Sequence, residues 1–69
     1  MTIRGTVSFF DAEQGYGRIT PQRGGHDSYV GPDALRIAGI STLSKGNRVR
    51  YDLSVDNFGK LSVINLEFA

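Results

Sequence analysis

The sequence predicts an all-β fold in which five antiparallel strands close into a small barrel. Three observations support this prediction. Apolar and polar residues alternate in five short segments, glycine-containing turns separate the segments, and no window long enough for a stable helix shows helical spacing of apolar residues. Because no helix covers a sheet, the strands must bury their apolar sides against one another, and closure also removes exposed sheet edges.

The chain has 69 residues and no cysteine. A chain of this length forms one domain, because it buries only about 60% of the surface that its unfolded form exposes. Disulfides and thiolate metal sites are excluded, so packing alone holds the fold. The first residues lack the apolar run of a secretory signal, and no stretch is long enough to span a bilayer. We therefore expect a soluble, cytoplasmic protein.

The first three predicted strands cover residues 3–10, 16–20 and about 27–31. In the first strand, the consecutive rings of Phe9 and Phe10 lie on opposite sides unless a bulge intervenes. Alternation in the next two strands places three large side chains on the opposite side from the small and apolar ones. The three are Tyr16, Arg18 and Tyr29.

Residues 32–47 form the longest irregular stretch, which we expect to be a mobile connection. Within it, residues 32–35 are compatible with one turn of 3₁₀-helix capped by Asp33. The fourth strand follows Gly46 and has the clearest alternation, with the apolar set Val49, Tyr51, Leu53 and Val55. The last strand covers about residues 60–68, and its predicted inward set is Ile64, Leu66 and Phe68.

The charge balance is nearly neutral: eight Lys and Arg residues oppose seven Asp and Glu residues, for a net charge of +1. This is far from the basic balance of a protein that relies on phosphate attraction alone. Six of the eight cations are arginine. Since a guanidinium can stack on a base as well as meet a phosphate, the type of cation is more informative than the number.

Catalytic and metal-binding chemistry finds no support in the sequence. No nucleophile, base and orienting group, and no paired carboxylates, can be assembled at plausible positions, which argues against an enzyme. His26 is the only histidine and has no second metal ligand nearby, so neither a metal nor a cofactor is expected. Gly15 and Gly17 lack the following helix that a phosphate-binding loop requires.

Exposed aromatic rings are the informative feature. Tyr16 and Tyr29 lie on neighbouring strands, and Phe9 or Phe10 lies beside them on the first strand. A barrel that turns several rings outward exposes a costly apolar patch, and such patches usually mark a binding surface. Unpaired nucleobases are common partners of flat rings, and each stack contributes about 1–3 kcal/mol.

The segment GTVSFFDAEQGYGRI, residues 5–19, resembles the opening of the bacterial cold-shock proteins, whose pattern reads G-x-V-K-W/F-F-N-x-x-K-G-F-G-F-I. The family's second motif, D-V-F-V-H, is matched by DSYVG at residues 27–31. The likeness continues to the end of the chain, where Tyr51 and Leu66 fall on family Phe and Val positions. It implies a single cold-shock domain over residues 1–69 with the five-stranded oligonucleotide-binding barrel, the OB-fold.

The resemblance also implies a function: binding of single-stranded RNA and DNA, RNA-chaperone activity, and regulation of transcription or translation under cold or other stress. It assigns base stacking to Phe9, Tyr16 and Tyr29, with Phe10 as a partly buried neighbour. We add two cations to the nucleic-acid-binding set, with solvated surface charge as the competing interpretation. They are Arg18 and Lys60. For Phe10, Tyr51 and Phe68, packing in the core is the favoured interpretation.

Four positions depart from the family pattern. Ser8 and Gln14 replace lysines, Arg18 replaces the second ring of the Gly-aromatic-Gly motif, and Gly31 replaces the histidine. These departures leave a second interpretation open, in which a divergent barrel with weakened nucleic-acid binding serves as a protein-interaction module. No membrane partner is expected, and the protein is expected mainly as a monomer, with a dimer left open.

Overall fold

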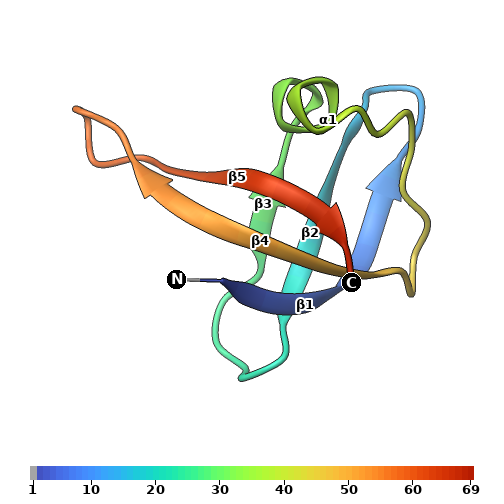
Figure 1. The fold of residues 1–69 in the computed structure, drawn as a ribbon, viewed down its shortest axis with the longest axis horizontal. Helices are drawn as coiled ribbons and strands as arrows, with labels where there is room; N and C mark the ends of the chain where they lie inside the picture. The colour runs from blue at the N-terminus through green and yellow to red at the C-terminus, as the bar shows by residue number, and fades with distance from the viewer. Residues whose placement is uncertain (1) are drawn as a thin grey trace.

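The computed structural model describes residues 2–69 as one antiparallel sheet rolled into a nearly closed barrel with a short helix (Figure 1). The elements are β1 (Ile3–Asp11), β2 (Tyr16–Pro21), β3 (Ser28–Val30), α1 (Pro32–Ala38), β4 (Arg48–Val55) and β5 (Leu61–Phe68). The strand order is β3-β2-β1-β4-β5, so β1 lies at the centre. This architecture confirms the predicted fold class, a five-stranded antiparallel OB-fold barrel.

The core is built from side chains that all five strands, the helix and the connection after the helix turn inward. No charged or polar side chain is buried with them among residues 2–69. The cluster consists of Val7, Ile19, Val30, Leu35, Leu43, Val49, Tyr51, Val63 and Leu66. The alternation of β2 and β3 predicted Ile19 and Val30 correctly, because neither strand contains an irregularity.

A bulge at Ser8 decides which phenylalanine of β1 faces outward. Val7 pairs with Ile19 and Phe9 pairs with Arg18, so Ser8 is an extra residue with no partner on β2. Strict alternation would put Val7 and Phe9 on the same side of the sheet. The extra residue reverses the side for everything after it, so Val7 is buried while Phe9 is 44% exposed. Phe10 turns inward and packs partly buried against the core.

The predicted inward set of β5 is only partly correct, because a second bulge in this strand reverses the side of Ile64. Val63 and Leu66 are buried, whereas Ile64 is 40% exposed and Phe68 is 49% exposed. The prediction was therefore correct for Leu66 but wrong for Ile64 and Phe68, and Phe68 is not a core residue. Strict alternation cannot place both Val63 and Leu66 inward, since they are three residues apart.

Asn65 produces this bulge. Its φ of 52° lies in the left-handed region, which asparagine tolerates better than most residues. The pairing between β4 and β5 shifts register at this point, between Arg50 and Asp52 of β4. The amide Nδ2 of Asn65 donates a hydrogen bond to Oδ2 of Asp52 over 2.9 Å, which fixes the distorted strand to its neighbour.

The stretch after β3 contains an α-helix rather than the predicted 3₁₀ turn. Pro32 begins α1, and Gly39 ends it in the left-handed conformation. Asp33 does not cap the helix but pairs with Arg36 over 3.0 Å. With seven residues and one buried side chain, Leu35, the helix is too short to show a period in the sequence. Nothing helical within residues 2–69 combines the length and apolar character needed to cross a bilayer.

The outer half of the β4–β5 hairpin projects beyond the barrel (Figure 1). The apolar alternation of β4 continues into it, but Leu53 and Val55 are exposed there. Oδ1 of Asp56 accepts hydrogen bonds from the backbone N–H groups of Phe58 and Lys60, at 2.8 and 2.9 Å, and so shapes the turn. The hairpin therefore holds its form through local hydrogen bonds rather than through burial.

A hydrogen bond of 3.2 Å inside the barrel joins the Ser28 Oγ of β3 to the phenolic oxygen of Tyr51 on β4. Tyr51 is only 1% exposed, so its hydroxyl group depends on this partner. The cold-shock proteins carry an apolar pair, valine and phenylalanine, at the two positions. This chain has a matched polar pair in the same place, which adds a link between β3 and β4.

We predict that Ser28→Ala lowers the free energy of unfolding by about 1–3 kcal/mol, because it leaves the buried Tyr51 hydroxyl unpaired. Ser28→Ala combined with Tyr51→Phe should destabilise the fold no more than Tyr51→Phe alone, since neither partner then remains unpaired. Urea unfolding of the wild type, both single variants and the double variant measures the coupling. Simple addition of the two single losses would contradict the assigned hydrogen bond.

Candidate nucleic-acid interface

Three aromatic rings form one continuous outward row across β1, β2 and β3. The ring centroids of Phe9 and Tyr16 are 5.8 Å apart with the planes tilted by 58°. Those of Tyr16 and Tyr29 are 5.9 Å apart, and their planes are inclined by only 27°. Phe9 is 44% exposed and Tyr29 57% exposed. These rings, called the aromatic row below, offer flat faces to solvent.

Strand register places Arg18 within the same surface. Its Cα pairs with Phe9 on one side and with Tyr29 on the other, so the three residues form a line across the sheet. Side chains directly opposite on one face have Cβ atoms about 4.5–5.5 Å apart. Arg18 is exposed and lies between two rings, at the position where the family has a third ring. The surface thus combines stacking faces with one guanidinium.

Gly17 allows β1 and β2 to approach closely behind the aromatic row. A Cβ atom at this position would collide with the backbone oxygen of Phe9 and would lie 2.8 Å from Cδ1 of Phe10. Any side chain at position 17 would therefore push the two strands apart. Gly17 therefore has a packing role on the inner side of the sheet. Its neighbours Tyr16 and Arg18 form the binding surface on the outer side.

Gly31 makes room for the ring of Tyr29. A Cβ atom at position 31 would lie 3.2 Å from Cε1 and 3.5 Å from the phenolic oxygen of Tyr29. The ring therefore lies over the glycine, in space that a larger residue at position 31 would partly occupy. The replacement of the family's histidine by Gly31 removes one side chain from the surface and lets the Tyr29 ring settle close to Tyr16.

Asp27 ties the three strands together beside the aromatic row. Its Oδ1 accepts a hydrogen bond of 2.9 Å from Oγ1 of Thr20, and its Oδ2 accepts one of 3.3 Å from Oγ of Ser8. Ser8 is the bulge residue of β1 and stands where the family carries a lysine. A serine here anchors the carboxylate by a hydrogen bond but supplies no positive charge to the surface.

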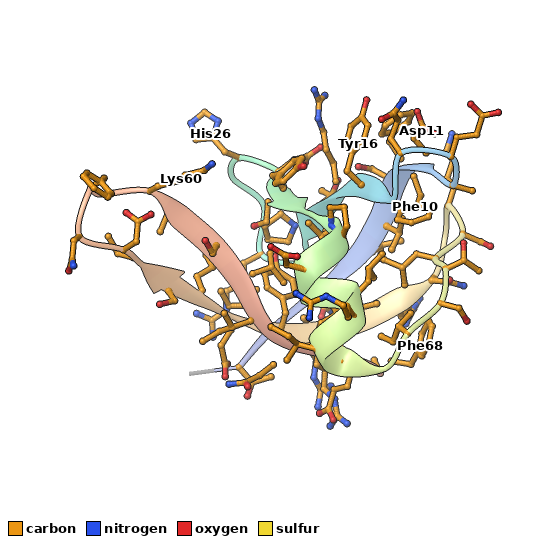
Figure 2. All side chains as sticks on the ribbon, turned by 90° about the horizontal axis from the view of Figure 1, so that it is seen from above. Phe10, Asp11, Tyr16, His26, Lys60 and Phe68 are labelled. Carbon is orange, nitrogen blue, oxygen red and sulfur yellow. The ribbon has the colours of Figure 1, made fainter. Side chains whose placement is uncertain are left out.

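The structure brings four of the six predicted binding residues together: Phe9, Tyr16, Arg18 and Tyr29. Phe10 lies on the other side of the sheet, against the core. Lys60 lies on the β4–β5 hairpin, well apart from Tyr16 and Asp11 (Figure 2). The contact between Gly31 and Tyr29 and the hydrogen bonds of Asp27 were not predicted. No sequence pattern indicates which residues these positions contact in the fold.

The arrangement is suited to binding a flat ligand. In the part of the chain from residue 2 onward, no group of three or more His, Cys, Asp or Glu side chains could hold a metal ion. Two carboxylates lie near the rings: Asp27 accepts hydrogen bonds from two hydroxyl groups, and Asp11, which pairs with Tyr16 across the strands, accepts hydrogen bonds from two backbone N–H groups. What this surface offers to a ligand is flat apolar area, with Arg18 as a charged neighbour, and such a surface favours planar ligands.

We predict that Gly31→Ala moves the Tyr29 ring away from Tyr16, because the added methyl group would lie 3.2 Å from the ring. Nuclear Overhauser effects between the two tyrosine rings should weaken. The contact between Phe9 and Tyr16, which does not involve position 31, is an internal control and should persist. An unchanged contact between Tyr16 and Tyr29 would contradict the role given to Gly31.

Comparison with known proteins shows which family this chain is similar to. The family described as the "Cold-shock" DNA-binding domain matches residues 3–66. A probable cold shock protein of Sinorhizobium fredii is 38% identical over 68 residues, covering 97% of this chain and 99% of that protein. Cold shock protein CspA of Rhizobium meliloti is 39% identical over 66 residues, with 94% and 96% covered.

A longer plant protein contains a similar segment. Cold shock domain-containing protein 4 of Arabidopsis thaliana is 38% identical over 63 residues. The match covers 91% of this chain but 31% of the plant protein. The chain therefore spans nearly the whole length of the two bacterial relatives and about a third of the plant relative.

Proposed function

This chain belongs to the cold-shock domain family, and we propose that it binds single-stranded RNA or DNA by stacking unpaired bases on Phe9, Tyr16 and Tyr29. The observation that carries the proposal is the aromatic row, in which centroids about 6 Å apart run across three strands. Because every base has a flat face, stacking of this kind tolerates many sequences. A duplex hides those faces, so the surface favours unpaired strands.

The magnitude of stacking sets the expected affinity. Three stacks at about 1–3 kcal/mol each contribute about 3–9 kcal/mol, which corresponds to dissociation constants from above millimolar to about micromolar. Contacts to phosphates add to this. Ser8 and Gln14 stand where the family has lysines, so this chain has fewer such contacts to make near the aromatic row. We expect binding weaker than a surface with those lysines would give.

Base stacking on the protein supports an RNA-chaperone role, because it requires no chemical reaction. A bound strand exchanges stacking between bases for stacking on protein rings, which holds the unpaired state open with no bond made or broken. Keeping RNA unpaired alters its use in transcription or translation, most strongly in the cold, where duplexes are more stable. We place this activity in the cytoplasm.

Two cations complete the proposed interface. Arg18 lies between the rings of Phe9 and Tyr29, where its guanidinium can lie flat on a base or pair with a phosphate. Lys60 is on the hairpin, away from Tyr16 (Figure 2). It can therefore contact a bound nucleic-acid strand only where that strand extends beyond the aromatic row. Phe10 contributes from the core side by supporting the sheet beneath the rings.

An exposed apolar hairpin favours a second candidate function, a protein-interaction module. Phe58 is 95% exposed, Val55 63% and Leu61 58%, all on the outer half of the β4–β5 hairpin. The dependence of binding affinity on salt concentration distinguishes the two functions. Affinity for a single strand must fall with salt, with a logarithmic slope of about −0.7 for each phosphate neutralised, whereas docking on an apolar hairpin changes little.

We predict that Tyr16→Ala and Tyr29→Ala each weaken binding of a pyrimidine-rich oligonucleotide by about 1–3 kcal/mol, because each removes one stacking face. Phe58→Ala is the control, since it removes a ring that is even more exposed from the distant hairpin and should leave affinity unchanged. Fluorescence titration measures the three affinities, and circular dichroism verifies the fold. Equal affinities for all three variants would refute the assignment of the aromatic row.

Arg18→Phe should tighten binding of the same oligonucleotide by about 1 kcal/mol or more, since it restores the family's ring between Phe9 and Tyr29. The slope of affinity against salt should become shallower if the guanidinium meets a phosphate in the wild type. Titration at two salt concentrations gives both values. Loss of binding would show instead that the guanidinium has an essential role that a ring cannot fill.

A further inference from the structure

We propose that a second surface of this chain, formed by Arg4, Arg48 and Arg50 on the outside of β1 and β4, binds a phosphate group. The surface is separate from the aromatic row and is called the arginine cluster below. Its ligand is defined by chemistry: a phosphate, carried by a nucleic-acid backbone or dissolved as inorganic phosphate. The site does not depend on the proposed stacking of bases.

Strand register concentrates positive charge at this place. Arg4 pairs directly with Arg50 across β1 and β4, while Arg48 pairs with Thr6. All three arginines lie opposite to the buried residues of their strands and so face outward. Like charges directly opposite on one face destabilise a sheet, and diagonal neighbours are only about 7–8 Å apart. A bound anion would remove this repulsion.

Protein carboxylates compensate only part of the charge. Nη2 of Arg50 pairs with Oε1 of Glu67 over 2.9 Å. Among residues 2–69, Arg4 and Arg48 form no ion pair within 4 Å. The Nε atom of Arg50 is buried and lacks a hydrogen-bond partner. Two positive charges therefore remain unpaired on a chain whose net charge is only +1.

The cluster is hollowed rather than flat. Arg4 and Arg48 line a hollow of about 210 Å³ together with Thr6 and Gln22, whose hydroxyl and amide groups can donate hydrogen bonds. Arg4 and Gln22 also line an adjoining hollow of about 570 Å³, to which Arg23 contributes. Guanidinium groups bind phosphate through paired N–H donors, so arginines around a polar hollow match a phosphate oxyanion in shape and charge.

The arginine cluster and the aromatic row share no residue. Arg4 precedes Phe9 by five residues of β1, which corresponds to roughly 16 Å along the strand. Tyr16→Ala removes an uncharged ring and so changes no charge in the arginine cluster. The two surfaces can therefore be tested one at a time.

The first arm of the experiment uses inorganic phosphate. Backbone amide signals are followed by NMR as phosphate replaces chloride at constant ionic strength, in the wild type, Tyr16→Ala and the double variant Arg4→Gln/Arg48→Gln. We expect saturable shifts in residues 4–6 and 48–50 of the wild type and Tyr16→Ala, and their loss in the double variant. Absence of such shifts in the wild type, or their persistence in the double variant, overturns the proposal.

The second arm identifies the source of the phosphate. Affinity for a single strand of about 16 nucleotides, the upper end of site sizes for this fold, is measured against salt. If the cluster holds backbone phosphates, the slope in Arg4→Gln/Arg48→Gln becomes shallower by about 0.7 for each phosphate that the variant no longer neutralises. Arg36→Gln, which removes an exposed arginine of α1, is the control and keeps the wild-type slope. An unchanged slope in the double variant, together with disappearance of the phosphate-induced NMR shifts, supports a site for inorganic phosphate alone.

Discussion

The register of β1 against its neighbours is the constraint on which both surfaces of this protein depend. One extra residue, Ser8, turns Val7 into the core and Phe9 out to solvent, beside Tyr16. Before the bulge, the same strand turns Arg4 outward against Arg50 of β4. A single strand thus carries an aromatic end and a cationic end on its outer face, while its inner face contributes to one core.

The parts of the fold that follow simple alternation could be predicted from the sequence. Ile19, Val30, Val49 and Tyr51 are buried as the pattern requires, and the resemblance to cold-shock proteins identified the barrel as an OB-fold, which alternation alone does not give. Both bulges break the two-residue period, and only tertiary pairing reveals them. The exposure of Ile64 could not be predicted, because it depends on the left-handed backbone of Asn65 within an apparently regular strand. The helix at Pro32–Ala38 was missed because one buried residue leaves no period.

The candidate site was predictable in its residue types but not in its fine arrangement. Tyr16, Arg18 and Tyr29 share a face because β2 and β3 are regular, and Phe9 joins them only through the bulge. Gly31 beneath the Tyr29 ring and Asp27 between Ser8 and Thr20 make their contacts across the fold, so no local pattern encodes them. Gly31 leaves room for the Tyr29 ring close to Tyr16, and Asp27 joins the strands, but neither supplies positive charge. The surface that results presents flat rings and the guanidinium of Arg18 in place of the family's lysines.

The most direct test of this account follows the ring signals of Phe9, Tyr16 and Tyr29 by NMR while a single strand, and separately its duplex, is added. Bases stacked on these rings would move their proton resonances upfield with the single strand and leave them nearly unmoved with the duplex. Ring resonances that stay in place while a single strand binds elsewhere on the barrel would contradict the account.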